Sequence, residues 1–428
     1  MNDQIATPNT HRRTRSLVAW WCAFGVCLVV AIARTTDVNR SVLYAEDGRR
    51  FLQDWVENPS LQLIFTPYDG YLHFIPRVAT GMVSLLPVDL WPAGCAIAAS
   101  ICLAAVGAFI WILLRPSGLP WWCRVMLTAI PICLPLASIE PIGNLANFHW
   151  FVAYLMVFIA FARVENYRSA IGWGFVALCC ALTEVQCALL LPVMAYRLIR
   201  HQHFRPVAIG WGVGMAAQTL AMVTSPRSYS AADSLDDTNI LRGYLTDAVA
   251  GSVTSKPETL TALFSSHGFD RLAIALAVYV AVCCLLAALG RGPWRFLVPG
   301  LLGLSAIAWL LTAVFGAGAS SMTFDAEGVF VTRWGMAASM YLLAAGALAL
   351  GVAALHFPKM KYAGVVALII TAVVWAPSFR SQLSYDGPSW EAEISEARQS
   401  CDLTPSQTPA LDIAPEGWGM VVPCEDLG

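Results

Sequence analysis

Residues 92–114 read PAGCAIAASICLAAVGAFIWILL and contain no charged side chain. A helix that rises about 1.5 Å per residue over such a run is long enough to cross the roughly 30 Å hydrocarbon core of a bilayer. The whole chain is 57% hydrophobic and 13% charged, whereas a soluble domain carries about 25% charged residues. The sequence therefore predicts an all-α fold, a polytopic transmembrane helical bundle.

Apolar runs and basic loops together predict the number and orientation of the spans. With about 17 to 25 residues per crossing, the spans fall at 16–34, 92–114, 121–138, 149–163, 170–183, 185–199, 206–223, 271–290, 296–315, 331–355 and 362–377. Alternate loops are basic and nearly free of acids, which is typical of the cytoplasmic side. We therefore expect about eleven spans, the N-terminus inside, the C-terminus outside, and large outer segments at 35–91, 224–270 and 378–428.

Two apolar segments do not fit this simple pattern. Residues 74–87 are short and contain Arg77, and counting them as a span would reverse the charge alternation. We expect them to form an amphipathic interfacial helix in the first outer loop. Residues 11–33 resemble a signal peptide, with Ala31-Ile32-Ala33 as a cleavage-like site, but the long apolar run favours an uncleaved first span.

Charge and motifs exclude several classes of function. The net charge is −2, so the sequence indicates no nucleic-acid partner. It contains no zinc-type Cys/His spacing, no Walker loop and no dinucleotide-binding glycine fingerprint. We divide the chain into a transmembrane module, 1–377, and an extracytoplasmic tail, 378–428.

The first outer loop carries the most informative polar residues. Glu46 and Asp47 follow the first span directly, and a later stretch contributes the polar residues Tyr68, Asp69, His73 and Arg77. Adjacent carboxylates near hydrocarbon raise each other's pKa, which suits a general base or a metal ligand. The alternative is that both acids begin an interfacial helix, where they complement the helix dipole.

Other polar clusters lie at the outer ends of later spans. Their members are Glu140, Asn144, Asn147 and His149, then Glu184 and Gln186. Such groups are expensive at membrane depth unless they bind something, so we interpret them as substrate-binding, with helix capping as the alternative. Arg333, Arg77 and Arg271 are candidates for binding a phosphate, although an interfacial Arg is often only a snorkelling anchor.

The first span, the acidic outer loop, the interfacial helix and the many later spans resemble the GT-C class of membrane glycosyltransferases. The stretches Tyr44-Ala-Glu-Asp-Gly48 and Pro67-Tyr-Asp-Gly-Tyr-Leu-His73 look like those of bacterial members of that class. The resemblance implies a multi-pass protein of the plasma (inner) membrane that works on the extracytoplasmic face among membrane lipids. It implies transfer of a sugar from a polyprenyl-phosphate donor to a cell-envelope glycan or glycolipid acceptor.

In this interpretation Asp47, with Glu46 beside it, is the catalytic base, while an Arg and His149 hold the departing phosphate. No cofactor is certain, but hard oxygen ligands suit Mg²⁺ or Mn²⁺, which Glu46 and Asp47 could hold. The main alternative is a transporter or flippase of a lipid-linked sugar. It would need charged residues along a path through the bilayer, and the proposed span interiors contain almost none. A scaffold protein would leave the clustered acids unexplained.

The polar tail contains Cys401 and Cys424, the two cysteines that we place in an outer aqueous segment. Thiols on the oxidising side of a membrane tend to pair. We therefore expect a Cys401–Cys424 disulfide that folds the tail against the outer cavity. Trp390, Ile394 and Ala397 recur at helical spacing and should share one helix face.

Overall fold

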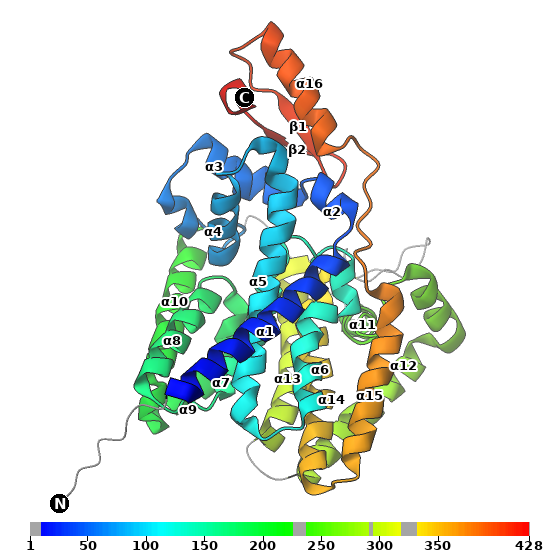
Figure 1. The fold of residues 1–428 in the computed structure, drawn as a ribbon. Coiled ribbons are helices and arrows are strands. Elements are labelled where there is room, and N and C mark those ends of the chain that lie inside the picture. The colour runs from blue at the N-terminus through cyan, green and yellow to red at the C-terminus, as the bar shows by residue number, and fades with distance from the viewer. Residues whose placement is uncertain (1–9, 226–236, 291–293, 318–331, 428) are drawn as a thin grey trace, which may run out of the picture.

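The computed structural model describes residues 10–225, 237–290, 294–317 and 332–427 (Figure 1). The chain is mostly helical, at 78%. Its main α-helices are α1 (Thr10–Arg34), α2 (Asp37–Ser41), α3 (Gln53–Glu57), α4 (Phe74–Val83), α5 (Trp91–Leu114), α6 (Trp121–Cys133), α7 (His149–Phe161), α8 (Tyr167–Ala181), α9 (Leu191–Arg200), α10 (Arg205–Thr224), α11 (Asp237–Gly243), α12 (Pro257–Leu289), α13 (Trp294–Thr312), α14 (Met336–His356), α15 (Met360–Trp375), α16 (Trp390–Leu403) and α17 (Cys424–Leu427).

Shorter helical turns and one small sheet complete the described fold. The turns that matter for the site are η1 (Asp47–Leu52), η6 (Ala146–Phe148), η7 (Val185–Leu190), η10 (Tyr244–Ala250) and η13 (Arg333–Gly335). Strands β1 (Ala410–Ile413) and β2 (Trp418–Val421) pair antiparallel in the tail, with Ala410 opposite Val421 and Ile413 opposite Trp418. Residues 226–236 of the outer segment 224–270, and the first residue of the span at 331–355, lie outside the described part.

Eight helices in the described part are long and apolar enough to cross a membrane. They cover Leu17–Arg34, Val88–Ser117, Trp121–Ser138, Gln202–Thr224, Gly268–Leu289, Trp294–Phe315, Arg333–His356 and Met360–Ser378. Within the segment 74–87, residues 74–83 form α4, which has 10 residues and is too short to cross; its place at the membrane interface remains a prediction.

The predicted spans at 149–163, 170–183 and 185–199 correspond to shorter helices, α7, α8 and α9, of 13, 15 and 10 residues. α7 is buried along almost its whole length by other helices, so it does not need to match the bilayer thickness. α8 packs closely on α10, because Gly174 lies against the Pro206 carbonyl, and a Cβ on Gly174 would approach that oxygen to 2.5 Å. Hydropathy does not distinguish burial in protein from burial in lipid.

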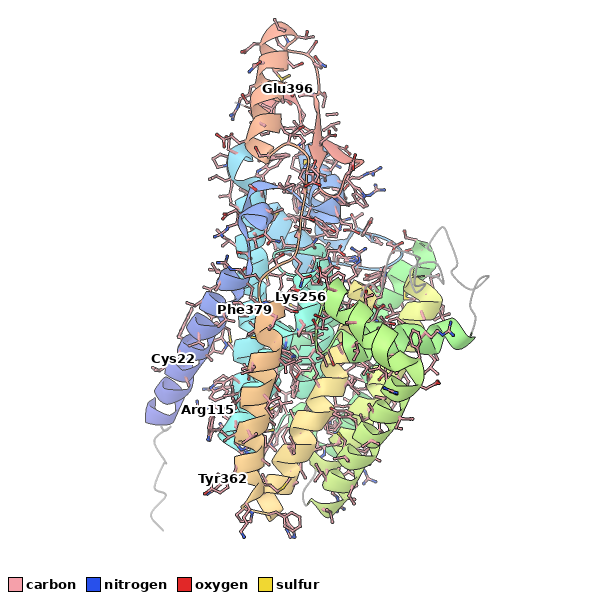
Figure 2. The ribbon with its side chains drawn as sticks, turned by 90° about the vertical axis from the view of Figure 1, so that its right-hand side faces the viewer. Cys22, Arg115, Lys256, Tyr362, Phe379 and Glu396 are labelled. Carbon is pink, nitrogen blue, oxygen red and sulfur yellow. A yellow bond between two sulfur atoms is a disulfide. The ribbon has the colours of Figure 1, made fainter. Side chains whose placement is uncertain are left out.

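The beginning of α1 and the C-terminal tail lie at opposite ends of the bundle (Figure 1). Figure 2 places Arg115 and Tyr362 toward the end opposite Glu396 of the tail. The prediction of about eleven spans is not settled by the eight candidate helices of the described part. The N-in, C-out orientation remains a prediction.

Arg34 ties three helix ends together at the end of the bundle nearer the tail. Its guanidinium is fully buried and donates to the carbonyls of Ile132 and Leu134, and to Phe379 O at 2.6 Å. The last carbonyls of a helix have no partner within the helix, and here Arg34 satisfies those at the end of α6. This contact fixes α1 and the chain after α15 against α6.

The tail from Ser389 onward forms a small folded module of α16, β1, β2 and α17. Cys401 and Cys424 form a disulfide, with Cα atoms 5.6 Å apart, so the structure contains the bond that we expected. The predicted helix face is also present, since Trp390, Ile394 and Ala397 are all buried. The tail is more ordered than its Pro-rich sequence suggested.

Candidate functional site

The two acids of the first outer loop begin η1 just after a strained residue. Ala45 has a φ of 42°, in the left-handed region that residues with a Cβ seldom adopt. The tail stabilises this conformation, because Ala45 N donates to Ala414 O at 2.5 Å and Ala414 N donates to Leu43 O at 3.0 Å. Glu46 and Asp47 follow this turn at the start of a helical segment, where adjacent side chains point in different directions.

Asp47 is buried, with 2% of its surface exposed. Its two carboxylate oxygens accept hydrogen bonds from the backbone N–H groups of Leu145, at 2.8 Å, and Ala146, at 2.7 Å. Burial raises the pKa of Asp47 to about 7, whereas the two N–H bonds act in the opposite direction. Asp47 therefore connects the first loop to the segment before α7, and both of its oxygens are already bonded to protein.

Glu46 contributes to a cluster of two carboxylates around one guanidinium. Arg333 Nη1 forms an ion pair with Glu140 Oε1, and Arg333 Nη2 lies 3.5 Å from Glu46 Oε1. The side chains of Arg333, Glu46 and Glu140 are 24%, 12% and 14% exposed, so the cluster is mostly buried but not closed. Burial, and after it the charge of Glu46, raises the pKa of Glu140, while Arg333 lowers it.

The segment from Glu140 to Asn147 is held by amide side chains. Asn147 Nδ2 donates to Glu140 Oε1 at 3.3 Å, and Asn144 Oδ1 accepts from Asn147 N at 3.0 Å. Asn39 of α2 donates to Ile142 O at 3.0 Å. Two polar atoms here, Glu46 Oε2 and Asn144 Nδ2, are buried and have no hydrogen-bond partner among the described residues.

His149 and Glu184 form a second polar pair beside this cluster. His149 Nδ1 contacts Glu184 Oε2, and Glu184 Oε1 accepts from Gln186 N at 2.7 Å. The Gln186 side chain bonds to Thr312 Oγ1 at 3.2 Å, which connects the pair to α13. A carboxylate on one imidazole nitrogen fixes the ring orientation and the tautomer.

Aromatic rings connect the His149 pair to the charged cluster and to the first loop. The His149 ring centroid lies 4.2 Å from Trp150 and 5.8 Å from His73, and Trp150 lies 6.1 Å from Trp334. The Arg333 guanidinium in turn lies 5.1 Å from the Trp334 ring centre. The predicted residues Glu46, Glu140, Asn147, His149, Glu184 and Arg333 thus belong to one continuous region.

Tyr68 and Asp69 occupy a tight turn at the edge of this region. Tyr68 and Tyr71 exchange backbone hydrogen bonds at 2.9 and 3.2 Å, and Asp69 and Gly70 both have positive φ, 51° and 85°. Asp-Gly is the pair that such a turn favours. Burial, then the charges of Glu46 and Asp69, raise the pKa of Tyr68 to about 12. Asp69 therefore shapes the turn that presents Tyr68.

The structure does not bring Arg77 into the charged cluster. Its guanidinium is buried, forms an ion pair with Asp54 at 2.8 Å and lies 5.2 Å from the Phe51 ring centre. A buried arginine that is already paired has little capacity to hold a ligand phosphate. The contacts of Arg77 favour a structural role within the first loop over phosphate binding. Arg271, the third candidate, is exposed on α12 and lies outside the charged cluster.

Sequence reasoning missed Asp247 in η10. Its carboxylate is buried and accepts from Thr332 N at 2.8 Å and Thr332 Oγ1 at 2.7 Å. Burial raises the pKa of Asp247 to about 7. Because Thr332 precedes Arg333, Asp247 fixes the backbone that carries the guanidinium. The signal that could have found it is a single acid in the apolar stretch Leu245-Thr-Asp-Ala-Val249.

The residues near Glu46 and Asp47 do not fit a divalent metal. Both Asp47 oxygens accept N–H bonds, and the cation beside Glu46 is Arg333. No group of three or more His, Cys, Asp or Glu side chains among the described residues could hold a metal ion. We derive no step through Mg²⁺ or Mn²⁺.

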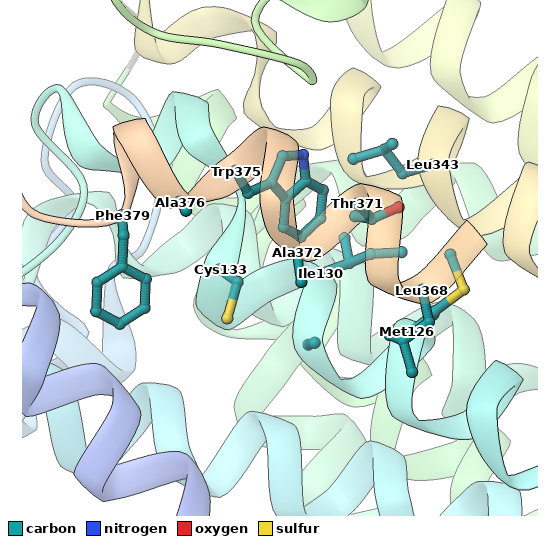
Figure 3. Close-up of a pocket in the computed structure, with 11 residues that line it drawn as sticks. Met126, Ile130, Cys133, Leu343, Leu368, Thr371, Ala372, Trp375, Ala376 and Phe379 are labelled. Atoms are coloured by element: carbon teal, nitrogen blue, oxygen red, sulfur yellow. The ribbon is translucent and has the colours of Figure 1, made fainter. Parts of the chain in front are cut away.

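A separate apolar groove of ≈ 430 Å³ lies among the spans, between α6, α14 and α15 (Figure 3). Its lining includes Ile130, Cys133, Leu368 and Trp375, with Thr371 as a polar exception. It offers room for a hydrocarbon chain but no group that could carry chemistry.

No family model, curated protein or solved structure matches this chain.

Proposed function

We propose that this chain is a membrane glycosyltransferase of the GT-C type. It would move a sugar from a polyprenyl-phosphate donor to a glycan or glycolipid acceptor of the cell envelope, on the extracytoplasmic face. The observation that supports this most is the convergence of Glu46, Glu140 and Arg333, from three distant segments, in one mostly buried cluster. Acids for proton transfer and a cation for a phosphate are the two groups that this reaction requires.

We assign the base to Glu46 and a supporting role to Asp47. Glu46 Oε2 has no hydrogen-bond partner among the described residues, whereas both Asp47 oxygens are bonded to backbone N–H groups. Glu46 would take the proton of the acceptor hydroxyl while the hydroxyl oxygen bonds to the anomeric carbon. The bond from that carbon to the donor phosphate oxygen breaks, and the phosphate leaves with the electron pair.

Arg333 would stabilise the negative charge of the departing lipid phosphate. A guanidinium carries five N–H donors, and the structure uses Arg333 for two carboxylates. A phosphate could therefore share the guanidinium or displace one carboxylate from it. Neutralising a developing charge in a site with little water is typically among the largest contributions to catalysis.

The test compares envelope glycans in cells that carry wild-type or altered chains. Glu46→Gln should lower transfer by about 10²–10⁴-fold, the usual effect of losing a positioned base. Asp37→Asn is the matched control, because Asp37 is an exposed acid on the neighbouring α2. Expression and size-exclusion behaviour should match the wild type in both variants. If Glu46→Gln, Glu140→Gln and Arg333→Gln all leave the envelope glycans unchanged, the proposal fails.

A further inference from the structure

The C-terminal module pairs with the backbone around the candidate base. Tyr44 and Ala414 form an isolated parallel bridge. Its two hydrogen bonds run from Ala45 N to Ala414 O and from Ala414 N to Leu43 O. They lie on either side of Tyr44, just before Glu46. The tail therefore holds the strained residue of this turn, Ala45.

Side chains extend this contact along η1. A Cβ on Gly48 would lie 2.8 Å from Ile413 Cδ1, so the glycine lets β1 approach the helical turn closely. Leu43 and Leu52 of the first loop share one hydrophobic cluster with Leu411 and Ile413 of the module. Val421 N also donates to Gln53 Oε1 at 2.7 Å. The contact is thus continuous from Leu43 to Gln53.

A second set of contacts fixes the module to η3 (Val88–Leu90), the turn just before α5. Trp390 Nε1 donates to Val88 O at 2.8 Å, and Arg398 forms two hydrogen bonds to Asp89, both at 2.9 Å. Inside the module, the Cys401–Cys424 disulfide joins α16 to α17. The sheet of the module has only two short strands, and the disulfide adds a covalent cross-link to it.

We propose that the C-terminal module is the positioning element of Glu46. By pairing with Leu43 and Ala45 it stabilises the left-handed turn and directs Glu46 toward Arg333. The part played by Glu46 rests on the proposed function, but the mechanical coupling of the module to residues 43–52 does not. The two statements can therefore fail separately.

The experiment measures amide hydrogen exchange in the full chain, purified in detergent, without any substrate. Two changes weaken the module: Cys401→Ser with Cys424→Ser, and, separately, Ile413→Ala. In each, the amides of residues 43–52 should exchange about tenfold faster, the change that corresponds to about 1.4 kcal/mol in local opening free energy. Peptides from α14 should be unaffected.

Two controls make the result specific. Cys22→Ser with Cys284→Ser removes two exposed thiols from the bundle and should leave residues 43–52 unchanged. Ile413→Val keeps the β-branched side chain and loses only Cδ1, the atom over Gly48, so it should accelerate exchange less than Ile413→Ala. If the tail amides exchange faster while residues 43–52 stay protected, the module does not position the loop. Equal acceleration in α14 would show general destabilisation and would also overturn the proposal.

Discussion

Two buried aspartates should respond in opposite ways to the same isosteric substitution. Asp47 and Asp247 are each 2% exposed, and burial raises the pKa of each to about 7. Their partners differ. Asp47 accepts from two backbone N–H groups, which can only donate. Asp247 accepts from one backbone N–H and one hydroxyl, and a hydroxyl can also accept.

An asparagine side chain fits the hydrogen-bond partners of Asp247 but not those of Asp47. In Asp247→Asn, the amide oxygen keeps the Thr332 N–H bond and the NH₂ group donates to Thr332 Oγ1. In Asp47→Asn, the NH₂ group must face the N–H of Leu145 or Ala146. Since both substitutions remove a carboxylate with a similar pKa, the charge effect largely cancels between the two variants. The remaining difference is one unsatisfied buried donor, worth about 1–3 kcal/mol.

The measurement is thermal unfolding of both full-length variants in the same detergent at pH 8, followed by size-exclusion chromatography of heated samples. Asp47→Asn should melt several degrees below Asp247→Asn, which should melt at or above the wild-type temperature. If the two variants melt together, the hydrogen-bond argument is wrong and Asp47 is not a structural acceptor. For the same reason, lost activity in Asp47→Asn alone would not identify a catalytic base.

The other predictions concern pH and topology. Because the pKa of Asp247 is raised from 3.8 to about 7 in the folded chain, the protonated form stabilises the fold fully below about pH 4. This contribution is lost as the pH rises to about 7, so wild type should lose up to roughly 4 kcal/mol relative to Asp247→Asn over that window. If the difference in unfolding temperature between wild type and Asp247→Asn is the same at pH 4 and pH 8, this prediction is contradicted. A reporter fused after Arg200 should be cytoplasmic and one at the C-terminus extracytoplasmic; a cytoplasmic C-terminus would exclude the orientation.

The sequence predicts the long spans well because a continuous apolar run of about 20 residues is stable in few surroundings besides a bilayer. It predicts the short helices α7, α8 and α9 less well, since their length depends on neighbouring helices rather than on lipid. Individual candidate residues could also be named from the sequence, because a charged side chain beside a span end is expensive, and Glu46, Glu140 and Arg333 were candidates on this ground. The contact between these three residues could not be predicted, because each lies on a different segment and no sequence spacing relates them.

The sequence also could not separate an acid that pairs with an arginine, as Glu46 does, from an acid that holds a backbone, as Asp47 does. Glu46 and Asp47 are adjacent and chemically alike, yet they have different partners, and the left-handed turn at Ala45 that precedes them has no signal in the sequence. That turn depends on Ala414, far away in the chain. The ion pair of Arg77 with Asp54 was not predicted for a related reason, since Asp54 is close in sequence but the burial of Arg77 comes from folding of the whole loop.

The charged cluster is carried by segments whose backbones are held by other side chains. Asn39 bonds to Ile142 O, Asp47 to the amides after Asn144, and Asp247 to Thr332. None of these bonds uses the charged tips of Glu46 and Arg333, whereas Glu140 Oε1 also accepts from Asn147 Nδ2. On the proposed function, an incoming phosphate would require only an exchange of side-chain partners at Arg333. A site whose backbone is already fixed avoids the reorganisation that would otherwise oppose transition-state binding. On the proposed function, this is a physical reason for the buried carboxylates of Asp47 and Asp247 to lie near the charged cluster without taking part in the chemistry.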